Sequence, residues 1–522
     1  MAPLIAISLI IATVTALILV PVVRKVARST GMVDRPDQTR KLQINAIALG
    51  GGVAVYVSLA IAFASTIVID RQFFGSTLGD VHYRWYLLFG AAGAMLVVGL
   101  VDDAWGLRGR QKLLLQCLII AGLVGSGSVI KSIGVFGLEI DLGLLAFPIT
   151  MLWLLIAVNA LNLIDGADGM ATTAGTIICI GMGFSALHFG STLSVVLAFS
   201  LAGSLIGFLK FNRPPASIYL GDAGSMMIGL FLGVLAIWCS LKESAVLASA
   251  PIAILAIPLF DSSAAILRRW LTGRSIYVTD RGHLHHLLQL KFGNRKMLLV
   301  VAGLCSVTTV MSVLSLYLNM PWLAGVGVAM VLVLCIYTRT FGHAEARLLY
   351  GRATNFAHSF TMNSANCQTL KQQRRVPLQG LGQWETVWEP LVEFAKSHDL
   401  ARVKIDLNLA WLHEGYHANW QSVRLPEKAY QLNVSLPLFT HRLGNDSQPV
   451  QIGRLEVVAL AKDARSYQKI AELSDQLIDL TPEIDRIVGR LESIRKPTVP
   501  AVSMPVSVAR VEESAESALH NA

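Results

Sequence analysis

The chain has 522 residues, of which 54% are apolar, and its formal net charge is +9 at pH 7. Charged residues make up only 15% of it, well below the roughly 25% of an average soluble domain. This composition excludes a disordered chain, which would lack apolar residues, and argues against a wholly soluble protein. The six cysteines show no metal-binding or disulfide spacing, so we interpret them as core-filling residues.

Residues 1–340 contain repeated apolar runs of about 17–23 residues, each long enough to cross a bilayer as a helix. They predict an all-α polytopic membrane domain with about eleven transmembrane helices. The first run has no basic residues before it and several directly after it, so we expect a retained helix and not a cleaved signal peptide. The runs lie near residues 2–23, 48–69, 85–101, 113–130, 145–160, 170–187, 193–209, 223–240, 247–266, 297–317 and 322–339.

Basic residues are divided unevenly between alternate loops. One set of loops carries about 18 Lys and Arg residues and the opposite set about 4. Because cytoplasmic loops are enriched in Lys and Arg, the first set is predicted to be cytoplasmic. The N-terminus is then outside and, with an odd number of spans, the C-terminus is cytoplasmic. The net charge therefore gives no reason to expect nucleic acid as a partner.

Polar side chains gather at the predicted cytoplasmic ends of the spans. An Asp at mid-membrane costs roughly 2.5–3.5 kcal/mol, so carboxylates at the ends of spans should face protein, ions or water. Several such segments on a single face predict a functional site. They are Asp102-Asp103, Asn159 to Asp168, Asn212 with Gly221 to Ser225, Asp261, and Asp280 to His286 in a long loop.

The carboxylate pair Asp102-Asp103 has two interpretations. It could end a helix at the interface, with Arg108 and Arg110 as ion-pair partners. Alternatively, because adjacent carboxylates repel each other, the pair could bind a hard divalent cation.

Between residues 159 and 168 the polar side chains recur at every third position. If the segment begins as a helix, Asn159 and Asn162 share a face, and Gly166 then ends the helix and leaves Asp165 and Asp168 in a loop. Helix capping is the structural alternative to binding a hydroxyl-rich or heterocyclic ligand.

The remaining segments also have alternatives. Gly221 to Ser225 allows close backbone approach to an anion or a metal-bound ligand, or is a plain turn. His283, His285 and His286 could contact phosphate, bind zinc, or belong to a solvated loop. Asp261 is expected to be structural, neutralised by the two arginines that follow its run.

Carboxylates, amides, histidines and basic residues on one membrane face are the groups that a magnesium-dependent phosphoryl transfer needs. A divalent ion draws charge from a pyrophosphate, cations and donors hold its oxygens, and a carboxylate positions or deprotonates the nucleophile. The spacing alone does not name the substrate.

In this order, these motifs resemble those of the polyprenyl-phosphate N-acetylhexosamine-1-phosphate transferases, of the glycosyltransferase family 4 type, which include phospho-N-acetylmuramoyl-pentapeptide transferase. The resemblance covers about residues 20–300. The His283-x-His285-His286 form and the predicted number of spans are more similar to the branch that uses UDP-N-acetylglucosamine.

The resemblance implies transfer of N-acetylglucosamine 1-phosphate from UDP-N-acetylglucosamine to undecaprenyl phosphate, with release of UMP. This would be the first membrane step of a cell-envelope polysaccharide such as lipopolysaccharide, in the bacterial inner membrane with a cytoplasmic active site. It implies Mg²⁺ as cofactor, with Mn²⁺ as an alternative, and a homodimer is one option for assembly. Another UDP-N-acetylhexosamine or UDP-MurNAc-pentapeptide is the alternative donor.

The same resemblance assigns roles to residues of this chain. Asp102, Asp103 and His283 would be catalytic, with Asp102 deprotonating or orienting the lipid phosphate. Asp222 and Asp103 would bind the metal. The expected substrate-binding residues are Lys41, Asn159, Asn162, Asp165, Asp168, Asn212, His285 and His286.

The chain departs from the family pattern after Arg40-Lys41. The family usually has His and spaced prolines there, whereas this chain has Gln43 and Asn45 before Gly50-Gly51-Gly52. The departure puts a proton-handling role of this loop in doubt and motivates a rival hypothesis, an inactive membrane scaffold. A secondary transporter is another rival, since intramembrane carboxylates also couple to ions, but polar residues at one interface argue against it.

Beyond residue 340 the composition becomes that of a soluble protein. We expect a juxtamembrane linker at 341–380, a small cytoplasmic α+β domain at 381–496 and a disordered tail at 497–522. The linker's basic stretch, Lys371, Arg374 and Arg375, could lie on the membrane surface or belong to a solvated linker. The domain should have helices at 384–396 and 466–494 and strands near 401–408, 430–439 and 449–461. His413, Glu414 and His417 are expected at its surface, and its partner is unknown.

Overall fold

The computed structural model describes residues 1–34, 46–135, 138–240, 249–272, 282–343, 373–379, 383–409, 412, 414–422, 431–440, 449–460 and 465–495, with short pieces between 345 and 354. The chain divides into two compact units, Met1–Met362 and Asn363–Ala522. Lys41, Gln43 and Asn45 lie outside the described residues, so their predicted roles stay predictions.

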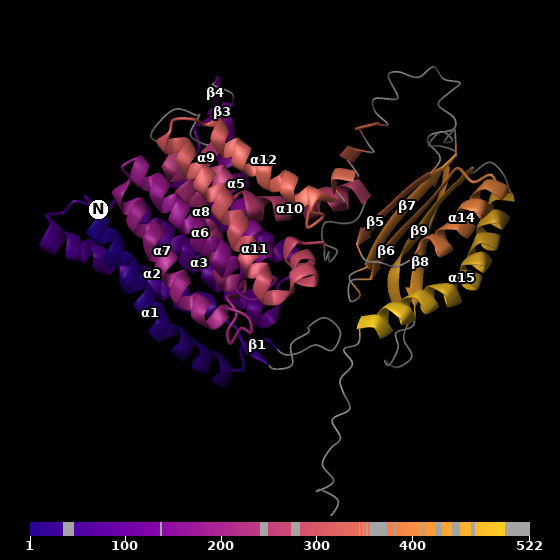
Figure 1. The fold of residues 1–522 in the computed structure, drawn as a ribbon, viewed down its shortest axis with the longest axis horizontal. Helices are drawn as coiled ribbons and strands as arrows, with labels where there is room; N and C mark the ends of the chain where they lie inside the picture. Colours follow the sequence, from indigo (N-terminus) through magenta and orange to yellow (C-terminus); the bar gives the residue numbers. More distant parts are fainter. Residues whose placement is uncertain are drawn as a thin grey trace, which may run out of the picture. The chain divides into compact units, whose positions relative to one another are not determined.

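The first unit is a bundle of helices (Figure 1). Eight of its described helices are long and apolar enough to cross a membrane, so this is a multi-pass membrane protein. They are α1 (Ala2–Ser29), α2 (Gly51–Ile69, extended by a π-helical turn at Asp70–Phe74), α3 (Tyr83–Trp105), α5 (Ala146–Ile164), α6 (Met170–His188), α7 (Thr192–Asn212), α8 (Gly221–Ser240) and α11 (Leu284–Tyr317).

The structure supports eight spans among the described residues, and the count of about eleven stays a prediction. The other predicted runs correspond to the shorter helices α4 (Gly109–Gly125), α9 (Ser249–Ile254) with α10 (Ala256–Thr272), and α12 (Trp322–Tyr337). Two physical features shorten them. Charged residues occupy the first turn of α4, and the helix of the ninth run is interrupted at Leu255.

Helix α8 is the centre of this unit. Its apolar stretch is 89% buried, against 22% for α1 at the periphery, and it packs against α3 and α5. Glycines allow the closest approach: a Cβ on Gly52 of α2 would meet the backbone of Gly224, and a Cβ on Gly99 of α3 would meet the backbone of Ala223. Small residues at such crossings let membrane helices pack at short distance. Both α2 and α3 are thus held against the first turn of α8.

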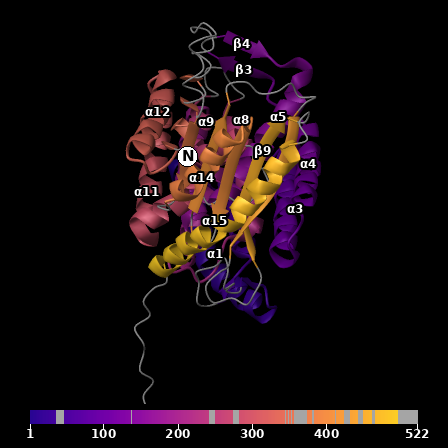
Figure 2. The same ribbon diagram turned by 90° about the vertical axis from the view of Figure 1, so that its right-hand side faces the viewer.

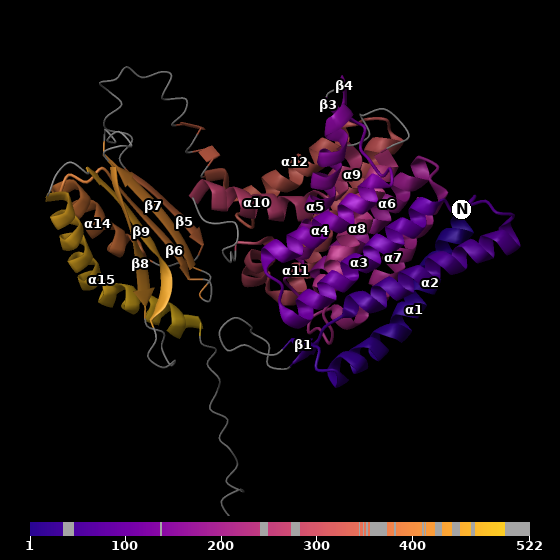
Figure 3. The same cartoon turned by 180° about the vertical axis from the view of Figure 1, so that it is seen from behind.

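Short antiparallel strand pairs lie at opposite ends of the helical unit (Figures 1 and 3). At one end β3 (Ser132–Val135) pairs with β4 (Leu138–Asp141), and at the other β1 (Val33–Asp34) pairs with β2 (Ile47–Ala48). Strand β2 also bridges to Ile218 in the loop before α8. The sequence predicted these two segments on opposite sides of the membrane, and which end is cytoplasmic stays a prediction.

The second unit is an α+β domain with a five-stranded antiparallel sheet. The strands run in the order β5 (Gln373–Gln379), β7 (Glu414–Gln421), β6 (Arg402–Leu409), β9 (Val450–Leu460) and β8 (Gln431–Thr440). Helices α14 (Glu385–Ser397) and α15 (Arg465–Arg495) cover one face of the sheet (Figures 1 and 2). The core forms there, because alternate residues of β6 such as Ile405 and Leu407 point into it, against Trp388 and Leu391 of α14.

Both predicted helices and the three predicted strands of this domain are present, whereas β5 and β7 were not predicted. Arg374 and Arg375 belong to β5 and not to a linker, while Lys371 lies outside the described residues. The prediction that Glu414 is a surface group was wrong, because its side chain is buried in β7. His417 is partly buried beside Asp406. His413 lies outside the described residues.

Candidate active site

Three helix ends meet where the polar motifs lie. Asp102 and Asp103 occupy the last turn of α3, Asp165 ends α5, and Asp222 lies in the first turn of α8. The Oδ1 atom of Asp103 accepts a hydrogen bond from Asp222 N at 3.0 Å, and its Oδ2 accepts one from Ala223 N at 3.4 Å. The first N–H groups of a helix have no intrahelical partner and favour a negative charge, so Asp103 caps α8. This contact joins the end of α3 to the start of α8.

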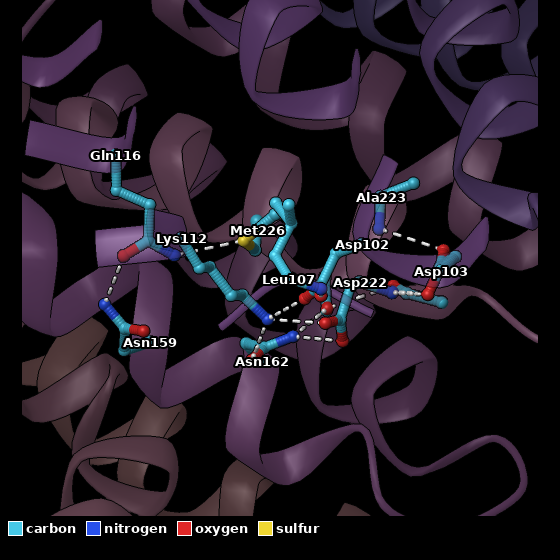
Figure 4. A network of polar contacts seen from close by, with 12 residues as sticks. Asp102, Asp103, Leu107, Lys112, Gln116, Asn159, Asn162, Asp222, Ala223 and Met226 are labelled. Atoms are coloured by element: carbon cyan, nitrogen blue, oxygen red, sulfur yellow. Dashed lines mark hydrogen bonds and ion pairs between the residues drawn. The ribbon is translucent and has the colours of Figure 1, made fainter. Parts of the chain in front are cut away.

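A lysine from a fourth helix lies between the other carboxylates (Figure 4). The Nζ atom of Lys112, in α4, is 2.9 Å from Asp102 Oδ2 and also forms an ion pair with Asp222 Oδ2. It donates to Asn162 Oδ1 at 3.2 Å as well. Asn162 in turn donates to Asp222 Oδ1 at 2.7 Å and to Ser225 Oγ at 3.0 Å. The network fixes carboxylates from α3 and α8 around one cation and one amide.

A second polar layer lies one helical turn further into the bundle. Gln116 follows Lys112 by one turn on α4, and its side chain is fully buried. Its Oε1 accepts from Asn159 Nδ2 at 3.0 Å, and its Nε2 contacts Met226 Sδ at 3.0 Å. The two amides predicted to share a face of α5 therefore do so, with Asn162 in the carboxylate layer and Asn159 beneath it.

The loop at residues 165–169 lies against the start of α11. A Cβ on Gly166 would overlap the imidazole of His285, so the histidine ring rests on this glycine. Asp168 Oδ2 accepts a hydrogen bond from Ala216 N at 2.9 Å, which ties the loop to the segment before α8. Burial, followed by repulsion from Asp222 and Asp103, raises the pKa of Asp165 well above its usual range.

The three histidines form one group at the start of α11. His283 is the residue before the first turn, and its Nδ1 lies 3.0 Å from Asp261 Oδ2 of α10. The rings of His283 and His285 are nearly parallel with centroids 5.8 Å apart, and those of His285 and His286 are 4.0 Å apart. Asp261 also accepts from Leu284 N at 2.7 Å, so one carboxylate holds both the ring and the helix start.

The prediction of a long loop was wrong for His285 and His286, because α11 already begins at Leu284, whereas His283 directly precedes the helix. Leu284 and Leu288 are buried one turn apart and extend the apolar face of the helix towards its N-terminus. The helix is broken at Gly293, whose φ of +72° is open to glycine and strained for other residues. The predicted start near residue 297 corresponds to the part after this break.

Asn212 lies at the end of α7, and both polar atoms of its side chain form hydrogen bonds within the protein. Its Oδ1 accepts from Thr172 Oγ1 at 2.7 Å, and its Nδ2 donates to Ile218 O at 3.0 Å. In this structure it therefore supports the loop that leads to Asp222. Its predicted contact with a substrate stays a prediction.

The partners of two carboxylates, Asp102 and Asp261, were not predicted from the sequence. Within the described residues, the ion-pair partner of Asp102 is Lys112 and neither Arg108 nor Arg110. Asp261 pairs with His283, whereas Arg268, one of its predicted partners, pairs with Glu345. The sequence signal for Lys112 was its spacing, because it lies one helical turn before Gln116 on the same face of α4. A count of basic residues in each loop does not use this spacing.

The carboxylates of Asp102 and Asp222 and the amide oxygen of Asn162 are ligands of the kind that a hard divalent cation prefers. In the structure the ammonium of Lys112 pairs with both carboxylates, and its single charge balances only one of them. In the described part of the chain, no group of three or more His, Cys, Asp or Glu side chains is arranged to hold a metal ion. A magnesium ion here would take further ligands from phosphate or water, as it does in many phosphate-binding sites.

Comparison with known proteins identifies the family. Residues 85–240 match the model of glycosyl transferase family 4, a range that contains Asp102, Lys112, Asn162 and Asp222. The chain is 32% identical over 303 residues to the probable undecaprenyl-phosphate N-acetylglucosaminyl 1-phosphate transferase of Bacillus subtilis, covering 57% of this chain and 81% of that protein. The chain belongs to glycosyl transferase family 4.

Two further family 4 relatives are similar over most of their own length. The decaprenyl-phosphate N-acetylglucosaminephosphotransferase of Mycolicibacterium smegmatis is 31% identical over 312 residues, which cover 53% of this chain and 74% of that protein. The undecaprenyl-phosphate alpha-N-acetylglucosaminyl 1-phosphate transferase of Yersinia pestis is 30% identical over 279 residues, covering 51% and 72%. The family predicted from the motifs is confirmed.

Proposed function

We propose that this family 4 protein transfers N-acetylglucosamine 1-phosphate from UDP-N-acetylglucosamine to undecaprenyl phosphate and releases UMP. The observation that carries the proposal is the agreement among its relatives: three of them are named for transfer of N-acetylglucosamine phosphate to a polyprenyl phosphate. The carboxylate, lysine and amide network at one end of the bundle supplies the groups that this chemistry requires.

In the proposed reaction an oxygen of the lipid phosphate attacks the β-phosphorus of the donor. The bond between that phosphorus and the bridging oxygen breaks, and UMP leaves with the bridging oxygen. The product is a lipid-linked pyrophosphoryl sugar. Catalysis of such a step depends mainly on holding the two phosphates in line and on balancing their charge.

Each residue of the network has a proposed part in this step. Lys112 would pair with the oxygens of the donor pyrophosphate, since its ammonium already lies between two carboxylates. Asp102 would orient or deprotonate the lipid phosphate. Asp222, whose backbone N–H donates to Asp103, would hold Mg²⁺ or Mn²⁺. The bound ion would draw charge from the pyrophosphate. The pairing of Lys112 with the donor would release Asp102 and Asp222 for these roles.

The groups around the network would recognise the rest of the substrates. His283, which contacts Asp261, would be a second catalytic residue beside Asp102 and would donate a hydrogen bond to a phosphate oxygen. His285 and His286 would lie beside His283 and contact phosphate. The amides and carboxyls of α5 and its following loop would line the nucleotide-sugar pocket. They are Asn159, Asn162, Asp165 and Asp168, with Asn212 behind them and Lys41 as a further anion contact.

The proposed site opens to the cytoplasm of a bacterial inner membrane. The soluble nucleotide-sugar would enter from that side, and the basic residues that cluster in the same set of loops support this orientation.

The test is turnover by the purified full-length chain in lipid-containing detergent with undecaprenyl phosphate, magnesium and a panel of UDP-sugars. UMP release and organic-extractable sugar are measured together. We expect both with UDP-N-acetylglucosamine. Product from another UDP-sugar alone would refute the donor assignment, and no product from any donor with folded protein would refute the activity.

A further inference from the structure

A buried ion pair that the proposed mechanism does not use lies close to the histidine group. Arg268, on α10, contacts Glu345, which follows α12, with 2.6 Å between Nε and Oε1. Their side chains are only 5% and 8% exposed. Burying two charges costs desolvation energy that the pair's attraction often fails to recover, so general stability is a weak reason for it.

The same arginine is fixed to the residue that precedes the histidines. Arg268 Nη2 donates to Gly282 O at 2.9 Å. A Cβ on Gly282 would overlap the guanidinium, so any other residue at that position would displace the arginine head from this place. The backbone held by Arg268 continues directly into His283.

Helix α10 therefore supports the histidine segment at two points. Asp261 binds the His283 ring and Leu284 N, and Arg268, seven residues or about two turns further along the helix, binds Gly282 O. Two contacts from one rigid helix fix both the position and the direction of the chain entering α11. Glu345 supplies the charge that orients the guanidinium for the second contact.

We propose that Arg268 and Glu345 form a positioning pair for the reaction. Glu345 orients the guanidinium, the guanidinium fixes the backbone at Gly282, and the three histidines are thereby presented to the phosphate-binding end of the site. Neither residue touches the reacting atoms. Glu345 precedes the second unit in the chain, so the geometry of the site depends on the segment that leads to that unit. The kinetic consequence rests on the proposed function, whereas the structural consequence does not.

The test compares variants of the full-length chain in lipid nanodiscs by kinetics and by hydrogen exchange of residues 284–292. Glu345→Gln keeps a hydrogen-bond acceptor but removes the charge. We expect kcat to fall by about 10- to 100-fold with little change in the donor KM, because displaced catalytic groups slow the chemical step without weakening donor binding. Exchange should rise in 284–292. Asp80→Asn, which removes the exposed ion pair to Arg71, is the control and should change neither quantity.

A second variant separates positioning from stability. Arg268→Met combined with Glu345→Leu replaces the buried charges with apolar groups, which commonly preserves or raises stability. We expect this variant to fold but to keep the low kcat and the fast exchange, because the contact to Gly282 O is gone. Wild-type kcat and wild-type exchange in both variants would overturn the inference. If the wild type turns over no donor, the proposed function fails, and the exchange comparison alone still decides the inference.

Discussion

The contact between Gly99 and the first turn of α8 offers a direct perturbation of the site. A Cβ on Gly99 would overlap both the N and the Cα of Ala223, the residue after Asp222. That Cβ would lie 2.3 Å from both atoms, whereas carbon atoms pack at about 3.5–4.0 Å, so Gly99→Ala forces α3 and the start of α8 apart by about 1.2–1.7 Å. Overpacking of this kind costs about 1–3 kcal/mol of stability. Because the shift separates Asp222 from Asp102, we expect turnover to fall by about 100-fold.

The same helix contains a matched control. Gly90 is also in α3, but a Cβ there would meet no atom within 4 Å. Gly90→Ala should therefore keep the melting temperature and the turnover of the wild type, while Gly99→Ala lowers both. Thermal unfolding by intrinsic fluorescence and UMP release, measured in the same detergent, give the comparison. Equal melting temperatures and equal rates for the two variants would refute the claim that this helix crossing sets the site.

Three further predictions concern the network itself. Asp222→Asn should abolish turnover while expression and gel-filtration profile stay normal; near-normal rates would refute its assignment to the metal. Lys112→Gln should lower kcat/KM for the donor by about 10- to 100-fold, the effect of losing charged hydrogen bonds worth about 1.5–3 kcal/mol, and an unchanged value would exclude a contact with the pyrophosphate. EDTA should stop turnover, and added Mg²⁺ should restore it. Added Mg²⁺ should also raise the melting temperature of the wild type, because a ligand that binds the folded state stabilises that state. Asp222→Asn should lack this rise, and an equal rise in both proteins would place the ion elsewhere.

The sequence predicted that the carboxylate and amide motifs lie at one end of the helices, because each of these motifs falls at the end of an apolar run. The ends of α3, α5 and α8 carry Asp102, Asn162 and Asp222, and these side chains are joined within one network. The period of the Asn159 segment also predicted that the two amides share a helix face. These features are local, so composition and spacing are enough to find them.

The parts that could not be predicted depend on tertiary contacts. The role of Asp103 as a cap follows from the approach of α3 to α8, and no local pattern encodes which free helix end a carboxylate will reach. The pairing of Arg268 with Glu345 joins residues that are far apart in the chain and replaces the nearby partner Asp261. In the second unit, β7 was not predicted although Tyr416, Ala418 and Trp420 alternate with polar residues, because Glu414 and Gly415 interrupt the pattern at the start of the strand.

The central claim is that a sugar phosphate, and not a sugar alone, passes to the lipid. Its most direct test uses UDP-N-acetylglucosamine labelled with ³²P at the β-phosphorus, undecaprenyl phosphate and the purified chain. If the phosphorus bond breaks as proposed, the label enters the organic phase with the lipid, and the released nucleotide is unlabelled UMP. Label that remains in the aqueous phase as UDP, while the sugar is found on the lipid, would contradict the account.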